Sequence, residues 1–131
     1  MRNGGFNMQK INLTDVKGDI FPAGRHSRML VGPGSIEAEQ FVSGHSSLFP
    51  NGSIPLHSHE NEEVYIILSG KGEMTVGEET EIVEGVTAVY IPPNTKHSLI
   101  NTGKENLTIL YIYAPAGIVD HWEQERTGQL K

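Results

Sequence analysis

The chain has 131 residues, of which 37% are hydrophobic and 20% are charged, so it is long enough to bury a core and too apolar to be disordered. Its formal net charge is −6, and its Lys and Arg residues form no basic stripe, which argues against a nucleic-acid partner. No apolar run approaches the roughly 20 residues that cross a bilayer, and the first residues lack the apolar stretch of a secretory signal. Cysteine is absent, so we expect no disulfide and no thiolate ligand, and a cytoplasmic protein.

Fifteen glycines and seven prolines divide the chain into short segments rich in Val, Ile, Tyr and Thr, a pattern typical of antiparallel strands. The sequences SGKG, VGEE, PPNT and NTGKEN supply the Gly, Asn and Pro that reverse the chain between them. Strands are predicted at Arg28–Val31, Ala38–Phe49, Glu63–Leu68, Gly72–Val76, Thr80–Val83, Ala88–Ile91, His97–Asn101 and Leu107–Tyr113. This many short strands in one small domain predict an all-β sandwich or barrel.

The two ends of the chain differ from this pattern. The first ten residues are expected to be disordered. The segment DHWEQERTG predicts one short C-terminal helix, with Asp120 as its cap and Gly128 after its end. Trp122 is expected to anchor this helix as a hydrophobic contact. We expect residues 1–131 to form a single domain.

The sequence PLHSHENEEVYIILS brings two histidines and a glutamate close together. Residues two apart face the same side of an extended segment, so His57 and His59 are expected to project together. The same period places Glu63, Tyr65 and Ile67 on one face of the following strand. A carboxylate on a buried face is costly unless it is paired, hydrogen-bonded or bound to metal.

His97, which follows the double-proline turn, is the natural fourth member of the set. Three imidazoles and one carboxylate predict a site for a divalent metal, with Fe, Mn, Co, Ni, Cu and Zn all compatible. In a six-coordinate site, two positions would remain for water, substrate or dioxygen. The alternative is a hydrogen-bonded polar cluster, and Glu60 and Glu62 are expected to be solvated loop residues.

These residues carry a family resemblance. The stretch Asn51–Gly70 resembles the first motif of the cupin superfamily, G-x5-HxH-x3-4-E-x6-G, and Val86–Asn101 resembles the second, G-x5-PxG-x2-H-x3-N. The resemblance implies a small single-domain cupin, which is a jelly-roll β-barrel (a double-stranded β-helix) with its core at about residues 36–114. It also implies a metal held by His57, His59, Glu63 and His97 toward one mouth of the barrel.

Three positions depart from the motifs. Asn51 and Asn94 stand where the motifs have glycine, and asparagine is the side chain that best tolerates a left-handed backbone. Val86 stands where glycine opens the second motif, with Gly85 one place earlier. That difference predicts a local shift or bulge ahead of strand Ala88–Ile91.

The resemblance also implies a homodimer, because small cupins often pair through an N-terminal strand. Here that strand would be Arg28–Val31 or the segment before it.

Several other polar residues are weaker candidates for the same site. Tyr65 can act as an acid or base, although a strand tyrosine is more often a packing residue. His45 can line the cavity or lie outside it. Arg25 and Arg28 can clamp a carboxylate or phosphate bidentately, although surface charge is the commoner role. Asn101 is expected to hydrogen-bond the backbone near the site.

Three functions are compatible with this site. The first is a metalloenzyme (a dioxygenase, isomerase, decarboxylase or lyase) acting on a small carboxylate, enol or sugar derivative, with Glu63 carrying a proton and Tyr65 in reserve. The second is a non-catalytic small-molecule sensor with the same metal. The third is a structural metal that ties strands together.

Overall fold

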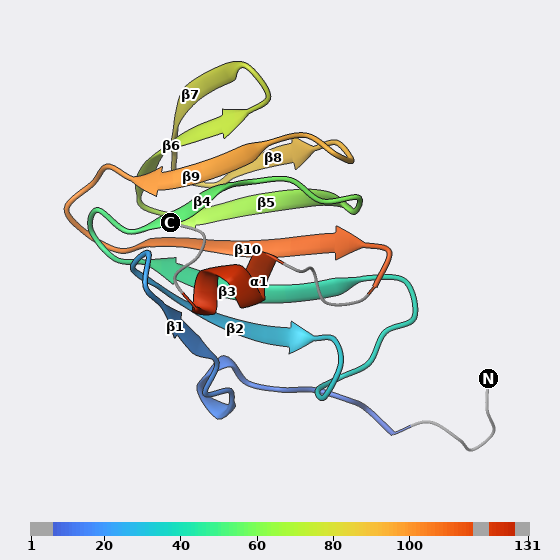
Figure 1. Cartoon of the computed structure of the whole chain (residues 1–131). Helices are drawn as coiled ribbons and strands as arrows, with labels where there is room; N and C mark the ends of the chain where they lie inside the picture. Colours follow the sequence, from blue (N-terminus) through green and yellow to red (C-terminus); the bar gives the residue numbers. More distant parts are fainter. Residues whose placement is uncertain (1–6, 117–120, 128–131) are drawn as a thin grey trace.

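The computed structural model describes residues 7–116 and 121–127, and these fold into two facing antiparallel β-sheets (Figure 1). The larger sheet has six strands in the order β1-β2-β3-β10-β5-β8, and the smaller has four in the order β4-β9-β6-β7. The elements are η1 (Leu13–Asp15), β1 (Asp19–Phe21), β2 (Arg25–Val31), β3 (Val42–Leu48), β4 (Ser53–His57), β5 (Glu62–Ser69), β6 (Lys71–Val76), β7 (Glu79–Glu84), β8 (Thr87–Ile91), β9 (His97–Asn101), β10 (Leu107–Ala114) and α1 (His121–Arg126). This arrangement confirms the predicted jelly-roll barrel.

The interior of the barrel follows from the two-residue period of its strands. In β10 the inward side chains are Leu107, Ile109, Tyr111 and Tyr113, each 5% exposed or less. In β5 the inward face begins at Glu63 and continues through Tyr65 and Ile67, as predicted. Because both strands change from apolar to polar toward the same end, where Tyr113 pairs with Glu63, one end of the barrel is a hydrocarbon core and the other carries polar side chains.

Most predicted strands are present with shifted ends. β3 begins at Val42 rather than Ala38, and β2 begins at Arg25 rather than Arg28. Two strands, β1 and β4, were not predicted. β4 contains Pro55, which cannot donate to a ladder and so argues against a strand; here β4 lies at the edge of its sheet, where proline is tolerated.

The asparagine substitutions in the motifs occupy the backbone conformation that was expected of them. Asn51 has φ of 68° and Asn94 has φ of 57°, a region that otherwise favours glycine. The register between β5 and β8 runs without a shift from Thr87 to Ile91, so β8 itself has no bulge. The expected local shift falls in the turn before β8, where Gly85 has φ of 71°.

The C-terminal helix is confirmed as α1, although the expected cap Asp120 and the expected terminal Gly128 lie outside the described residues. The predicted disorder of residues 1–10 also lies outside them for residues 1–6. Among the described residues, no helix combines the length and apolarity needed to span a bilayer. The single domain, the homodimer and the cytoplasmic location stay predictions.

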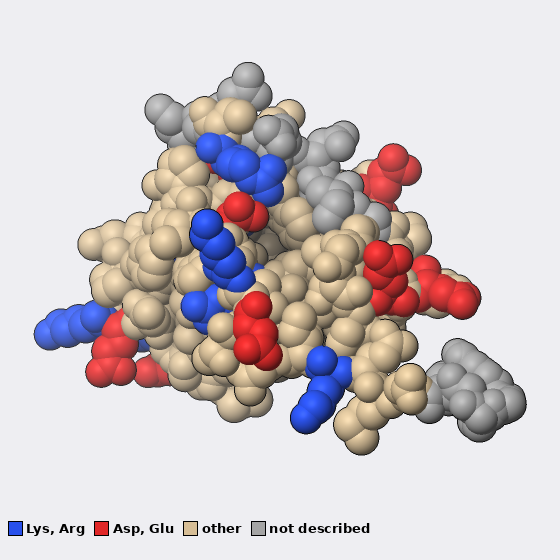
Figure 2. Space-filling view, turned by 90° about the horizontal axis from the view of Figure 1, so that it is seen from below, with Lys and Arg blue, Asp and Glu red and all other residues tan. Residues whose placement is uncertain are grey.

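The charges of the surface are mixed. Figure 2 shows basic and acidic side chains interspersed on the face seen from below, so that neither sign forms a continuous stripe there.

β1 forms the outer edge of the larger sheet beside β2. The edge strand on this side of the barrel is therefore β1 rather than Arg28–Val31.

Candidate metal centre

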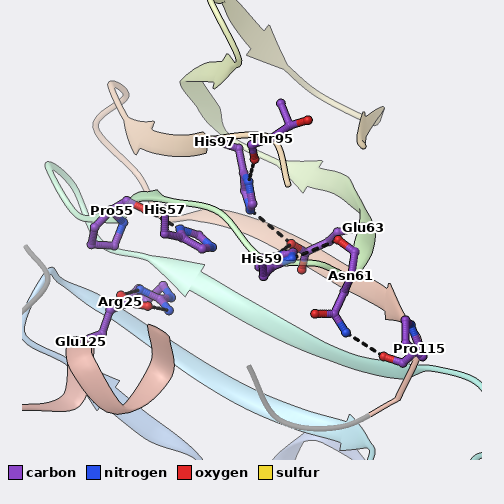
Figure 3. A network of polar contacts seen from close by, with 10 residues as sticks. All are labelled: Arg25, Pro55, His57, His59, Asn61, Glu63, Thr95, His97, Pro115 and Glu125. Carbon is purple, nitrogen blue, oxygen red and sulfur yellow. Dashed lines mark hydrogen bonds and ion pairs between the residues drawn. The ribbon is translucent and has the colours of Figure 1, made fainter. Parts of the chain in front are cut away.

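The candidate ligands come from both sheets and meet at one mouth of the barrel (Figure 3). His57 ends β4 and lies opposite His97, the first residue of β9, in the smaller sheet. His59 follows in the loop after β4, and Glu63 projects inward from β5 in the larger sheet. The site therefore bridges the two sheets.

The three imidazoles converge. One ring nitrogen from each of His57, His59 and His97 lies within 4.8 Å of the other two, close to the roughly 3–4 Å that separates nitrogens bound about 2.1 Å from one metal ion. The ring centroids of His57 and His97 are 4.2 Å apart, and that of His59 is 5.5 Å from His57 and 5.0 Å from His97. His97 is fully buried and His57 is 8% exposed.

The backbone fixes the tautomer of each ring. The Nδ1 atoms of His57, His59 and His97 lie 2.6, 3.0 and 2.8 Å from the carbonyl oxygens of Pro55, Asn61 and Thr95. A carbonyl only accepts, so each Nδ1–H must donate. In the neutral rings, the lone pair therefore lies on Nε2, where a metal would bind.

Glu63 lies among these Nε2 atoms. Its Oε1 is 3.0 Å from Nε2 of His59 and 3.3 Å from Nε2 of His97. Burial alone would raise the pKa of Glu63, but the hydrogen bond from His59 and the adjacent His97 hold this pKa below its usual value. Glu63 is therefore a carboxylate in the folded protein.

The pKa values of His57 and His59 are shifted in opposite directions. Burial, reinforced by the neighbouring His97, lowers the pKa of His57 to about 3. Burial also acts to lower the pKa of His59, but the hydrogen bond to Glu63 outweighs it and raises that pKa. His57 is thus neutral at physiological pH, while His59 holds a proton against Glu63 more strongly than a free imidazole.

These features fit a divalent transition metal. The Nε2 atom of His97 is buried, and it makes no hydrogen bond within the described part of the chain despite its closeness to Glu63. A buried polar atom without a hydrogen bond is costly, and a metal ion would satisfy it. Three imidazoles and one carboxylate are a donor set for Fe, Mn, Co, Ni, Cu or Zn.

Tyr65 lies one step further into the barrel. Its side chain is 2% exposed, and its ring meets that of His97 edge-on at a centroid distance of 5.9 Å. Burial, and next the charge of Glu63, raise the pKa of Tyr65 well above its usual value. Tyr65 therefore stays protonated, and its hydroxyl can donate a hydrogen bond.

An inner cavity of about 20 Å³ adjoins the centre. Its lining includes His57, Glu63 and Tyr65, and the remainder comes from β2, β3, β4, β10 and α1: Arg25, Ser27, Ser46, Ile54, Tyr111, Tyr113 and Trp122. Sequence reasoning missed the two β10 tyrosines, although the alternation of LTILYIY places both on the inward face.

Other candidates lie elsewhere. His45 is on the outer face of β3, in register with Arg28 of β2, so neither lines the inner cavity. Glu60 and Glu62 are exposed, as expected, but Glu62 is the first residue of β5 rather than a loop residue. Asn101 donates to the carbonyls of Leu48 and Glu105, which confirms its bonds to the backbone. It lies at the opposite end of β9 from His97, roughly 13 Å away at strand spacing, so the expected closeness to the site is wrong.

Arg25 does clamp a carboxylate, and that carboxylate is the chain's own Glu125. Both terminal nitrogens of the Arg25 guanidinium donate to the two oxygens of Glu125, and both side chains are almost completely buried. Glu125 was not predicted. Its position three residues after Trp122 places both on one side of α1, which is the only local signal for it.

Known proteins match part of this chain. The family model for the cupin domain matches residues 44–113, a range that contains all four candidate ligands. An uncharacterized protein of Methanocaldococcus jannaschii is 45% identical over 56 residues, which are 42% of this chain and 45% of that protein. Glucose-6-phosphate isomerase of Pyrococcus horikoshii is 45% identical over 64 residues, which are 44% of this chain and 34% of the isomerase. The chain thus spans less than half the length of either relative.

A solved structure extends the comparison to most of the barrel. The structure of a predicted oxalate decarboxylase from Thermotoga maritima superposes with a TM-score of 0.73 at 18% identity, covering 80% of this chain and 97% of that one. At this identity the likeness shows a shared fold.

Proposed function

The chain belongs to the cupin family, and from that premise we propose that it is a metalloenzyme acting on a small oxygenated molecule. The proposed metal ligands are His57, His59, Glu63 and His97. The proposed substrate is a carboxylate, an enol or a sugar derivative that approaches the metal through its oxygen atoms. The reaction would be an isomerisation, decarboxylation, elimination or dioxygenation.

One observation carries this proposal. Each of the three imidazoles donates its Nδ1–H to a backbone carbonyl two residues away, so Nε2 is the nitrogen of each ring that would bind a metal. Held in this way, the rings need little reorganisation to bind an ion. A cluster retained only for its hydrogen bonds would not need the three tautomers aligned.

The chemistry divides between the metal and two side chains. A bound divalent metal would supply Lewis acidity to polarise the substrate oxygens. Glu63, a carboxylate beside His59, can accept a proton from the substrate. Tyr65 stays protonated, so it can donate a proton or hydrogen bond from deeper in the barrel.

The relatives support an enzyme acting on small oxygenated molecules. One is named a glucose-6-phosphate isomerase, and the structural neighbour is described as a predicted oxalate decarboxylase. The alternative is a non-catalytic sensor with the same metal site. The small volume of the inner cavity, about 20 Å³, does not separate the two, because a sensor and an enzyme must both admit a small molecule.

Elemental analysis of protein purified without added metal or chelator tests the proposal. We expect a near-stoichiometric transition metal, its loss in His59→Ala, and its retention in His45→Ala, which removes an outward-facing histidine from the same barrel. The identity of the metal then selects the assay: oxygen consumption for iron, and isomerase, lyase or decarboxylase substrates for the others. Absence of metal in the wild type, with none taken up on titration, would contradict the proposal; metal binding without turnover would favour the sensor.

A further inference from the structure

The helix α1 inserts a charged side chain into the barrel. Glu125 is 1% exposed and lies 100 residues from its partner Arg25, which is 2% exposed. Nη2 of Arg25 donates to Oε1 of Glu125 at 2.8 Å, and Nη1 donates to Oε2. This two-pronged contact is the geometry by which arginine binds a carboxylate or phosphate ligand.

The remaining surroundings of Arg25 resemble a built anion site. Nη1 also reaches the carbonyl oxygen of Ser53 at 3.3 Å, and the guanidinium carbon lies 4.3 Å from the centroid of the Phe21 ring. Nε is buried and has no hydrogen-bond partner among the described residues. The guanidinium is thus held by the Ser53 carbonyl and by the Phe21 ring, both of which belong to the barrel.

Arg25 and the candidate metal centre share one space. Arg25, His57 and Glu63 all line the inner cavity of about 20 Å³. That volume holds about one water molecule, whereas sites for small-molecule ligands have roughly 300–1,000 Å³. A substrate of that size does not fit the cavity as it stands, and Trp122 of α1 forms part of its wall.

Trp122 lines both the inner cavity and an outer groove. An outer groove of about 370 Å³ lies next to the inner cavity, and the two share Ser27, Tyr111 and Trp122 as lining residues. Trp122 comes from α1 and packs edge-on against Tyr111 and Tyr113, at centroid distances of 5.8 and 6.0 Å. Movement of this one helix would join the groove to the cavity.

We propose that Arg25 is the anion subsite of the active centre and that Glu125 occupies it as an internal competitor. The substrate would carry an anionic group, a carboxylate or a phosphate, in addition to the oxygen atoms that face the metal. Its anionic group takes over the Arg25 fork, Glu125 is released to solvent, and α1 with Trp122 moves off the cavity. This inference rests on the proposed function and narrows its substrate class to anions.

An ion pair kept only to anchor α1 is the competing explanation. Burial removes both charges from water, and apolar side chains of similar size often anchor elements as well or better. The exposed pair between Arg126 and Asp19, whose nitrogen and oxygen are 3.3 Å apart, already ties α1 to β1. The two pairs provide a matched comparison, because only one of them reaches the cavity.

The test uses protein loaded with Co²⁺ and titrated with oxalate, malonate, succinate and inorganic phosphate. Visible absorption of Co²⁺ reports on the metal centre, and Trp122, the single tryptophan of the chain, reports on α1 through its emission. We expect at least one of these anions to change both signals in the wild type. Glu125→Gln should bind that anion at least tenfold more tightly, Arg25→Lys at least tenfold more weakly, and Arg126→Gln within threefold of the wild type.

The outcomes separate the inference from the function on which it rests. If the Co²⁺ absorption responds but Glu125→Gln binds no more tightly than the wild type, or Arg126→Gln gains as much as Glu125→Gln, the internal competitor is wrong and the metal-centre proposal stands. If Co²⁺ is not held at all, the proposed function fails. If Glu125→Gln does not fold, acrylamide quenching of Trp122 in wild-type protein saturated with the anion decides: unchanged quenching overturns the inference.

Discussion

His57 and His97 lie directly opposite each other on β4 and β9, with ring centroids 4.2 Å apart and both side chains buried. Glu63 faces them from β5 in the other sheet. A metal held by these three residues would tie the two sheets together at the mouth, where apolar packing is weakest.

Removal of the metal should therefore lower the stability of the barrel. A ligand present at 1,000 times its Kd stabilises the folded state by about 4 kcal/mol, which for a chain of this size corresponds to a fall in Tm of about 15 °C when a chelator removes it. Calorimetric scans with and without chelator measure this difference. His59→Ala serves as the control, since its Tm should not respond; an equal response in both proteins would show that the chelator acts elsewhere.

Metal binding should release a proton from His59. The raised pKa of His59 means that metal-free protein holds a proton there between pH 6.5 and that raised value, and a metal requires the neutral ring. We expect the release to approach about one proton per metal when the pH lies below the folded-state pKa, and to fall toward zero as the pH rises through it. Titration calorimetry in buffers of different ionisation enthalpy measures it. Glu63→Gln should reduce the release, and release that does not depend on pH would contradict this assignment.

The low pKa of His57 predicts acid sensitivity of the metal-free protein. Its folded-state pKa is about 3, against 6.5 for the usual imidazole, so between these values the unfolded chain binds a proton that the folded chain does not. Stability should thus fall as the pH drops below 6.5, with a slope approaching about 1.4 kcal/mol per pH unit from this group. Above pH 6.5 the raised pKa of His59 acts in the opposite sense, because there the folded form holds the additional proton. Urea unfolding between pH 4.5 and 7 should show the acid slope in the wild type and a smaller one in His57→Gln.

Tyr65→Phe should separate catalysis from metal binding. Removing only the hydroxyl preserves the ring that packs beside His97, so metal content should be unchanged. If Tyr65 donates a proton in the reaction, kcat should fall about 100-fold or more, with a small change in KM. Steady-state kinetics beside elemental analysis provide both values, and an unchanged kcat would leave Tyr65 with a packing role.

Stability and metal affinity should depend on the positive φ angle at position 94 rather than on the amide side chain of Asn94. The N–H of Asn94 donates to the carbonyl of His59 at 2.7 Å, so this turn supports the loop that presents a ligand. Asn94→Ala at φ of 57° should cost about 1–2 kcal/mol of stability and weaken metal affinity, whereas Asn94→Gly should be close to neutral in both. Denaturant unfolding and metal titration of the two variants test the difference; equal losses would assign the effect to the amide group.

The sequence predicted those parts of the site that depend on local geometry. The two-residue period placed Glu63, Tyr65 and Ile67 on one face, and the known tolerance of asparagine for positive φ predicted the turns at Asn51 and Asn94. Each of these inferences needs only a few neighbouring residues.

What the sequence did not predict depends on distant pairing. Nothing near Arg25 indicates that Glu125 will meet it from the far end of the chain. The outward position of His45 follows from the register of β3 against β10, which a single strand does not specify. β4 was predicted only as an extended segment at His57 and His59, because its pairing with β9 at a sheet edge is a property of the whole barrel.

Strand β9 is five residues long, and its three inward side chains are His97, Leu99 and Asn101. The first belongs to the reactive mouth, the second to the core, and the third ties the turn before β10 to the end of β3. Because Leu99 separates them, a substitution of His97 leaves the hydrogen bonds of Asn101 at the far end in place. One short strand thus supplies the polar mouth and the closure of the opposite end through different residues.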